Sequence, residues 1–89
     1  MGQAARKKPK RLAGKLFHIR TALGLSQNEM IKRLGFVDEL SQSNLSGFER
    51  GIREPSLLVL LQYARAAGIT MEVLVDDDLD LPKRFYKGF

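Results

Sequence analysis

The chain lacks several features that would place it in whole classes of protein. It contains no cysteine, which excludes a disulfide framework, a thiolate metal site and a cysteine nucleophile. No apolar run approaches the roughly 18 residues of a membrane-spanning helix, and no apolar segment follows the basic N-terminus as in a secretory signal. No stretch alternates apolar and polar residues for long enough to predict a strand. We therefore expect a soluble, cytoplasmic, all-α protein.

Size and charge narrow the class further. A length of 89 residues with 44% hydrophobic residues predicts a single folded domain. Residues 1–53 carry 11 Lys or Arg against 4 Asp or Glu, whereas the rest carry 4 against 6, which gives the net charge of +5. A basic first half beside a slightly acidic second half favours a protein with one surface that binds a polyanion. A charge that serves only to keep the protein soluble could give the same distribution.

Apolar spacing and helix-boundary residues predict five helices. Apolar residues recur at helical intervals from Leu12 to Leu23, and Phe17 is expected to widen this apolar stripe. Gly24 follows as a C-terminal cap, with Leu25 expected to fold back as its hydrophobic contact. Ser26 and Glu29 have the spacing of a capping box at the start of the next helix. The later helices are expected to start at Ser41, Ser56 and Thr70, to end at Gly51, Gly68 and near Val75, and to bury Leu45, Phe48, Leu57, Leu60, Leu61, Ala64 and Leu74.

Two terminal segments flank the helical region. We expect a flexible basic arm over 1–9, a folded domain over 10–76 and a tail over 77–89. The arm either follows phosphates or is only a solvated tail. Asp76, Asp77 and Asp78 oppose the helix dipole and are expected to be solvated where the fifth helix ends, without a metal. The basic arm residues are Arg6, Lys7, Lys8 and Lys10, and the tail includes the aromatic residues Phe85, Tyr86 and Phe89.

Four segments, taken together, resemble the Cro/phage-repressor (Xre-type) helix-turn-helix family. They are residues 19–27, 45–51, 53–57 and 64–71, and the resemblance extends from about Leu12 to Val75. Each segment alone is a weak signal, but all four in order at near-family spacing are specific. The resemblance implies a compact five-helix domain in which the second and third helices form the helix-turn-helix.

The resemblance also implies which residues meet DNA. Gln27 would contact a phosphate and brace a recognition helix over 42–50, with Gln42 and Ser43 facing base edges. Gln can bond adenine through two hydrogen bonds and Ser can donate or accept, which suits that role. Arg50 and Arg53 suit phosphates. The implied DNA-binding set is Gln27, Ser41, Gln42, Ser43, Asn44, Ser46, Arg50 and Arg53.

A structural ion pair between Arg20 and Glu49 is implied by the same family pattern. We expect it to be partly buried and to tie the first helix to the third. Two departures from the pattern concern the recognition region. The turn before the recognition helix is longer by about four residues, 37–40, which either extend the second helix or form a loop that itself meets the DNA. Gly47 stands where the family places a long polar side chain, and its lack of a side chain is expected to permit close approach of the backbone to DNA.

Apolar residues also stand at positions where the family is usually polar. They either form a protein interface or pack beneath the tail. The residues of this expected interface are Leu58, Val59, Val73, Phe85 and Tyr86.

The resulting functional hypothesis is a transcriptional regulator. It would bind a near-palindromic site on double-stranded DNA as a homodimer, and most simply as a repressor. An antitoxin-type module that binds both DNA and a toxin is the main alternative. Binding of RNA or single strands is less favoured, because the folded part lacks an aromatic stacking platform. No cofactor or metal is expected, and an enzyme is disfavoured because the lone histidine, His18, has no catalytic partners.

Overall fold

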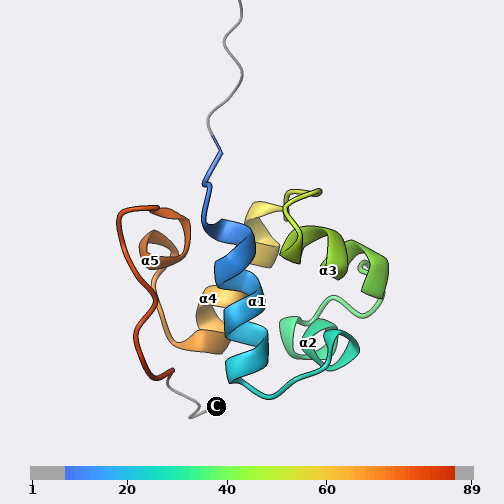
Figure 1. Cartoon of the computed structure of the whole chain (residues 1–89). Coiled ribbons are helices and arrows are strands. Elements are labelled where there is room, and N and C mark those ends of the chain that lie inside the picture. The colour runs from blue at the N-terminus through green and yellow to red at the C-terminus, as the bar shows by residue number, and fades with distance from the viewer. Residues whose placement is uncertain (1–7, 86–89) are drawn as a thin grey trace, which may run out of the picture.

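The computed structural model describes residues 8–85, and those residues form five α-helices without a strand. Helix α1 lies at the centre of Figure 1, with α2 and α3 on one side, α5 on the other, and α4 behind it. The predicted all-α, five-helix class is confirmed. The bounds are α1 Leu12–Ala22, α2 Gln27–Leu34, α3 Gln42–Glu49, α4 Leu57–Ala67 and α5 Met71–Val75.

Local polar groups set most of the helix starts. The hydroxyls of Ser26, Ser41, Ser56 and Thr70 each accept a hydrogen bond from the backbone N–H three residues later. Each satisfies a donor that the first turn of a helix would otherwise leave unpaired. These four residues are the predicted caps, so the helix starts could be located from the sequence alone.

The end of α1 is a Schellman motif. Gly24 adopts a φ of 74°. Its N–H donates to Thr21 O at 3.0 Å, and the N–H of Leu25 donates to Arg20 O at 3.2 Å. Leu25 then packs against the core, as the cap prediction expected. This tight reversal places the start of α2 directly beside the end of α1.

The hydrophobic core lies between the five helices, with α1 packed against α3, α4 and α5, and α2 packed against α3 and α4. Leu16, Ile19, Leu45 and Tyr63 are completely buried in it. Burial raises the pKa of the Tyr63 hydroxyl, since the charged phenolate would be poorly solvated there. The same cluster contains Leu12, Met30, Ile31, Leu34, Phe48, Val59, Leu60, Ala64, Ala66, Ala67 and Leu74.

The buried face of α4 differs from the prediction. Leu57 was expected inside but is 71% exposed, whereas Val59 was expected outside but is only 2% exposed. The reason is Tyr63, the largest fully buried side chain. Residues three and four positions away on a helix share a face, so burying Tyr63 also turns Val59 and Leu60 inward. Phe17, expected to widen the apolar stripe of α1, is exposed as well.

The segment after α5 is hydrogen-bonded to the start of α1. The carboxylate of Asp77 accepts from the backbone N–H groups of Lys10 at 2.8 Å and Arg11 at 2.9 Å. Helix α1 has no capping side chain of its own, so a residue 66 positions away supplies this function. The donated hydrogen bonds lower the pKa of Asp77. The expectation that this aspartate is merely solvated is therefore wrong.

Lys15 makes a second link between α1 and the same segment. Its ammonium is buried and donates to the carbonyl oxygens of Val73, Asp76 and Leu79 at 2.8, 2.9 and 2.8 Å. A lysine ammonium has three donors, and all three are used. The Val73 carbonyl in the last turn of α5 is thereby satisfied, and the carbonyls of Asp76 and Leu79 tie the following segment to α1.

The lengthened connection between α2 and α3 forms a separate turn. The N–H groups of Glu39 and Leu40 both donate to Phe36 O, at 3.1 and 2.9 Å. Phe36 and Leu40 pack against the core, while Val37 is exposed. The extra residues therefore do not extend α2, which was one of the two predicted outcomes.

Candidate nucleic-acid interface

The start of α3 is held by a capping box formed by Ser41 and Asn44. Asn44 N–H donates to Ser41 Oγ at 3.1 Å, and Ser41 N–H donates to Asn44 Oδ1 at 2.9 Å. The Ser41 hydroxyl and the Asn44 amide oxygen therefore each use a hydrogen bond to stabilise the helix start itself. Gln42 and Ser43, the next two residues, are exposed. They present free polar groups to an approaching ligand from a fixed backbone.

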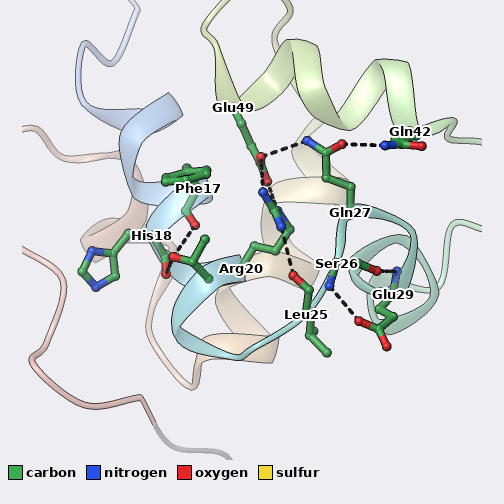
Figure 2. A network of polar contacts seen from close by, with 10 residues as sticks. Phe17, His18, Arg20, Leu25, Ser26, Gln27, Glu29, Gln42 and Glu49 are labelled. Carbon is green, nitrogen blue, oxygen red and sulfur yellow. Dashed lines mark hydrogen bonds and ion pairs between the residues drawn. The ribbon is translucent and has the colours of Figure 1, made fainter.

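A chain of side-chain hydrogen bonds connects this helix start to α1 (Figure 2). Gln42 Nε2 donates to Gln27 Oε1 at 3.1 Å, and Gln27 Nε2 donates to Glu49 Oε1 at 3.2 Å. Glu49 in turn accepts from Arg20, whose Nη1 also donates to Leu25 O at 3.0 Å. The first residues of α2 and α3 and the end of α3 are thus held in one network that starts from α1.

The ion pair expected between Arg20 and Glu49 is present at the inner end of that network. Nε bonds Oε2 at 2.7 Å and Nη2 bonds Oε1 at 3.0 Å. The two side chains are only 13% and 4% exposed. The hydrogen bond to Glu49 raises the pKa of Arg20. The guanidinium also lies 5.5 Å from the centre of the exposed Phe17 ring, within the range of a cation–π interaction.

The Gln27–Gln42 contact leaves hydrogen-bonding groups of Gln42 unused at the surface. Gln42 uses one of its two amide protons on Gln27, so its second proton and its Oε1 stay available. Those are the two groups that a bidentate contact with adenine requires. Because Gln27 and Gln42 are the first residues of α2 and α3, their contact also brings two helix N-termini together. Both ends carry positive partial charge, which favours an anion.

The outer face of α3 continues with Ser46 and Gly47 and reaches Arg50 after the helix. Ser46 is half-buried and Arg50 is exposed. Gly47 is buried because the side chain of Arg53 lies over it. A Cβ at position 47 would be 3.1 Å from Arg53 Cδ. The expectation that Gly47 leaves open space for DNA to approach the backbone is therefore wrong.

The basic arm reaches this side of the molecule in its described part. Lys8 forms an exposed ion pair with Glu54, Nζ to Oε2 at 3.8 Å, next to the connection between α3 and α4. Lys10 is exposed and is held through its backbone by Asp77. The predictions for Arg6 and Lys7 lie outside the described residues.

The predicted protein interface is only partly at the surface. Leu58 is 63% exposed and Val73 is half-buried. Val59 belongs to the core, so its assignment to an interface is wrong. Phe85 packs against the core, with its ring edge-on to His18 at a centroid distance of 5.8 Å. Tyr86 lies outside the described residues.

Comparisons with known proteins agree with this geometry. Residues 16–74 match the Helix-turn-helix family. An uncharacterized HTH-type transcriptional regulator of Sinorhizobium fredii, y4dJ, is 36% identical over 74 residues, which make up 82% of this chain and 91% of that protein. The chain belongs to the helix-turn-helix family of transcription regulators. The resemblance to Cro and the phage repressors is thus confirmed, and α2 and α3 are the helix-turn-helix.

Solved structures show that this helix-turn-helix protein has the phage-repressor fold. The P22 c2 repressor, solved with a synthetic operator, is 24% identical with a TM-score of 0.64, covering 75% of this chain and 96% of that one. SinR in complex with DNA is 23% identical with a TM-score of 0.61, covering 73% and 98%. A chain of the SinR/SinI complex is 22% identical with a TM-score of 0.63, covering 75% and 62%. This chain therefore spans less than two thirds of that last protein.

Residues 8–85 lack a metal site and a membrane-spanning helix. No described group of three or more histidine, cysteine or acidic residues is placed to hold a metal ion. No helix of the described part is both long and apolar enough to cross a bilayer. The chemistry that the described surface offers is hydrogen bonding and positive charge around the start and end of α3.

Proposed function

We propose that this helix-turn-helix protein binds double-stranded DNA sequence-specifically and regulates transcription, most simply as a repressor. Helix α3 would enter the major groove with Gln42 and Ser43 against base edges. Gln27 would donate to a phosphate while it holds Gln42 in place. Arg50 would contact a phosphate, while Ser46 and the cap residues Ser41 and Asn44 would contact the backbone or base edges around this point. The function is binding rather than catalysis, and it needs no cofactor.

The hydrogen bond between Gln42 and Gln27 carries this proposal. It restrains an exposed, rotamer-rich side chain at the start of an exposed helix, and it leaves two polar groups of that side chain unused. Restraining a contact residue before binding reduces the entropy lost when the complex forms. A surface glutamine without a binding role would gain nothing from being restrained in this way. The DNA and operator complexes of SinR and the P22 c2 repressor agree with the same use of the fold.

We infer further that the active form is a homodimer on a near-palindromic site. The short helix α3 presents few base-reading side chains, so two copies are needed for useful affinity. Two-fold symmetry would place the recognition helices in successive major grooves, about 34 Å apart. The exposed Leu57 and Leu58 at the start of α4 are the apolar surface best suited to the dimer contact.

Selection of bound sites from random duplex DNA tests the function. We expect a motif with two inverted half-sites whose centres are about 10 base pairs apart. Gln42→Ala should change the preference at one position of each half-site. Arg65→Ala, which removes a charge from an exposed position of α4, should leave the motif unchanged. Binding without any sequence preference would refute the proposal.

An antitoxin-type role is a second candidate that the exposed Leu57–Leu58 pair favours, since this pair could hold a toxin instead of a second copy. Light scattering with the chain alone and with Leu58→Ser separates the two functions. A dimer that becomes monomeric in Leu58→Ser supports the regulator with its own dimer contact. A monomer that copurifies stoichiometrically with a second small protein supports the antitoxin.

A further inference from the structure

Gly47 occupies the outward-facing stripe of the recognition helix. It is four residues after Ser43 and three before Arg50, and positions three and four apart share one face of a helix. Ser43 and Arg50 are both exposed. Gly47 alone on this stripe is buried, although it has no side chain to bury. Something other than the core must therefore cover it.

The aliphatic stem of the Arg53 side chain (Cβ, Cγ and Cδ) covers Gly47. A Cβ built on Gly47 would lie 3.4 Å from Arg53 Cβ, 3.2 Å from Cγ and 3.1 Å from Cδ. The stem thus runs across the glycine and is closest at the end that carries the guanidinium. The backbone strengthens this placement, since the N–H groups of Ile52 and Arg53 both donate to Gly47 O, at 2.9 and 3.2 Å. A Cβ at position 47 would require the stem to shift by a few tenths of an ångström.

The guanidinium of Arg53 is available for a ligand. The residue is exposed, and no hydrogen bond or ion pair joins its guanidinium to another residue in the 8–85 range. It therefore differs from Arg20, whose three guanidinium nitrogens each donate a hydrogen bond inside the fold. A free cationic fork lies at the place where a side chain of residue 47 would otherwise extend from the recognition helix.

We propose that Arg53 reads a guanine base edge, in place of a side chain at position 47. This inference rests on the proposed DNA-binding function, and it changes the role expected for Arg53 from a phosphate contact to a determinant of specificity. Arginine can donate two parallel hydrogen bonds to guanine O6 and N7 in the major groove. The glycine restrains the stem against α3, which aims the fork along the same surface as Ser43. Sequence preference would then depend on a residue outside the recognition helix.

Site selection and affinity measurements on four proteins test the proposal. In the unmodified chain, one guanine per half-site should be preferred at the position that Arg53 faces. Arg53→Ala should lower discrimination at that position by roughly tenfold or more, with the other positions unchanged. Arg53→Lys keeps the charge but lacks the planar fork, so it should lose the same preference and retain the salt dependence. Arg50→Ala, the matched control, should weaken binding to all sequences alike.

Gly47→Ala provides an independent test through the glycine. The added methyl should displace the Arg53 stem and weaken the same guanine preference while Arg53 is intact. In the Arg53→Ala background it should have no effect on preference, so the two substitutions should be non-additive. Thermal unfolding verifies that each variant is folded. If Gly47→Ala is unfolded, the guanine preference of Arg53→Lys, compared with that of the unmodified chain, tests the proposal instead.

The results separate this inference from the function on which it rests. If the unmodified chain selects a motif but Arg53→Ala weakens all sites equally, Arg53 is a phosphate contact and the inference is wrong, while the regulator function stands. If Arg53→Lys keeps the full guanine preference, the planar fork of Arg53 is not what reads the base, since an ammonium can also reach guanine O6 and N7. If the unmodified chain selects no motif, both proposals are overturned.

Discussion

Arg20 and Glu49 are joined by two parallel hydrogen bonds although they lie 29 residues apart in the chain. Their pairing holds α1 against the end of α3, and Gln27 extends it to the start of α3. A buried pair of this kind adds little net stability but makes the loss of either partner costly. It defines the orientation of the recognition helix, because both ends of α3 depend on it.

Glu49→Gln is expected to destabilise the protein strongly. The amide has one acceptor oxygen and no charge, so the nearly buried guanidinium of Arg20 loses its partner, at a cost of about 3–5 kcal/mol in unfolding free energy. Urea denaturation measures this loss, and Glu39→Gln, at an exposed position of the turn over 36–40, is the control. Unchanged stability and DNA affinity in Glu49→Gln would show that the pair has no structural role.

Gln27→Ala should reduce DNA binding more than it reduces stability. It removes two hydrogen bonds between polar side chains near the surface, which together contribute about 1–3 kcal/mol to folding. The larger effect is that Gln42 loses its support, so Gln27→Ala and Gln42→Ala should be non-additive in binding free energy. Asn28→Ala, next along α2 and exposed, serves as the control. Strict additivity of the two glutamine variants would contradict the bracing role.

Lys15→Met should weaken the attachment of the segment after α5. Methionine fills a similar volume but leaves three carbonyl oxygens without their donor, and an unsatisfied buried group costs about 1–3 kcal/mol. Amide hydrogen exchange should rise most at residues 73–81, where the bonded carbonyls lie. Lys32→Met, on the exposed surface of α2, should leave both stability and exchange unchanged. Equal exchange in Lys15→Met and the unmodified chain would exclude this locking role.

Asp77→Asn should lower the melting temperature at neutral pH, and the difference should disappear in acid. The N–H groups of Lys10 and Arg11 lower the pKa of Asp77 in the folded state. Its stabilising contribution is therefore complete above the ordinary carboxyl pKa of about 4 and is lost as pH falls through the lower folded value. Asp78→Asn, an exposed neighbour, should show no such difference at any pH. The comparison requires melting curves from pH 7 down to pH 2.

Gly14→Ala and Gly24→Ala should have opposite effects on stability. Neither added methyl would meet another atom within 4 Å, so space does not distinguish the two sites. Gly14 lies inside α1, where alanine is better by about 0.5–1 kcal/mol. Gly24 has a φ of 74°, where a side chain costs about 1–2 kcal/mol. Equal changes in melting temperature would contradict the conformational explanation.

The parts of the fold that could be predicted are those governed by neighbours in the chain. Ser26 and Glu29 are three residues apart, and their capping box needs no distant partner. The same holds for the caps at Ser41, Ser56 and Thr70 and for the reversal at Gly24. The Arg20–Glu49 pair was expected only through the family resemblance, because nothing local indicates a contact across 29 residues.

The errors occurred where packing between helices overrides local pattern. An apolar run such as Leu57 to Leu61 is compatible with several buried faces, and only the burial of Tyr63 selects the one that turns Val59 inward and Leu57 outward. Gly47 was interpreted as open space, because the sequence could not show that Arg53 folds back over it. Each error concerns the direction in which a side chain points rather than the presence of a helix.

The sequence by itself determined where the helices begin and end and which family the protein resembles, since capping, glycine turns and residue spacing act within a few positions. Only the tertiary structure decided that Asp77 caps α1, that Lys15 satisfies the end of α5 and that Arg53 covers Gly47. These contacts join segments that are brought together by burial of the shared core. Their geometry therefore depends on how the helices pack, which no local pattern contains.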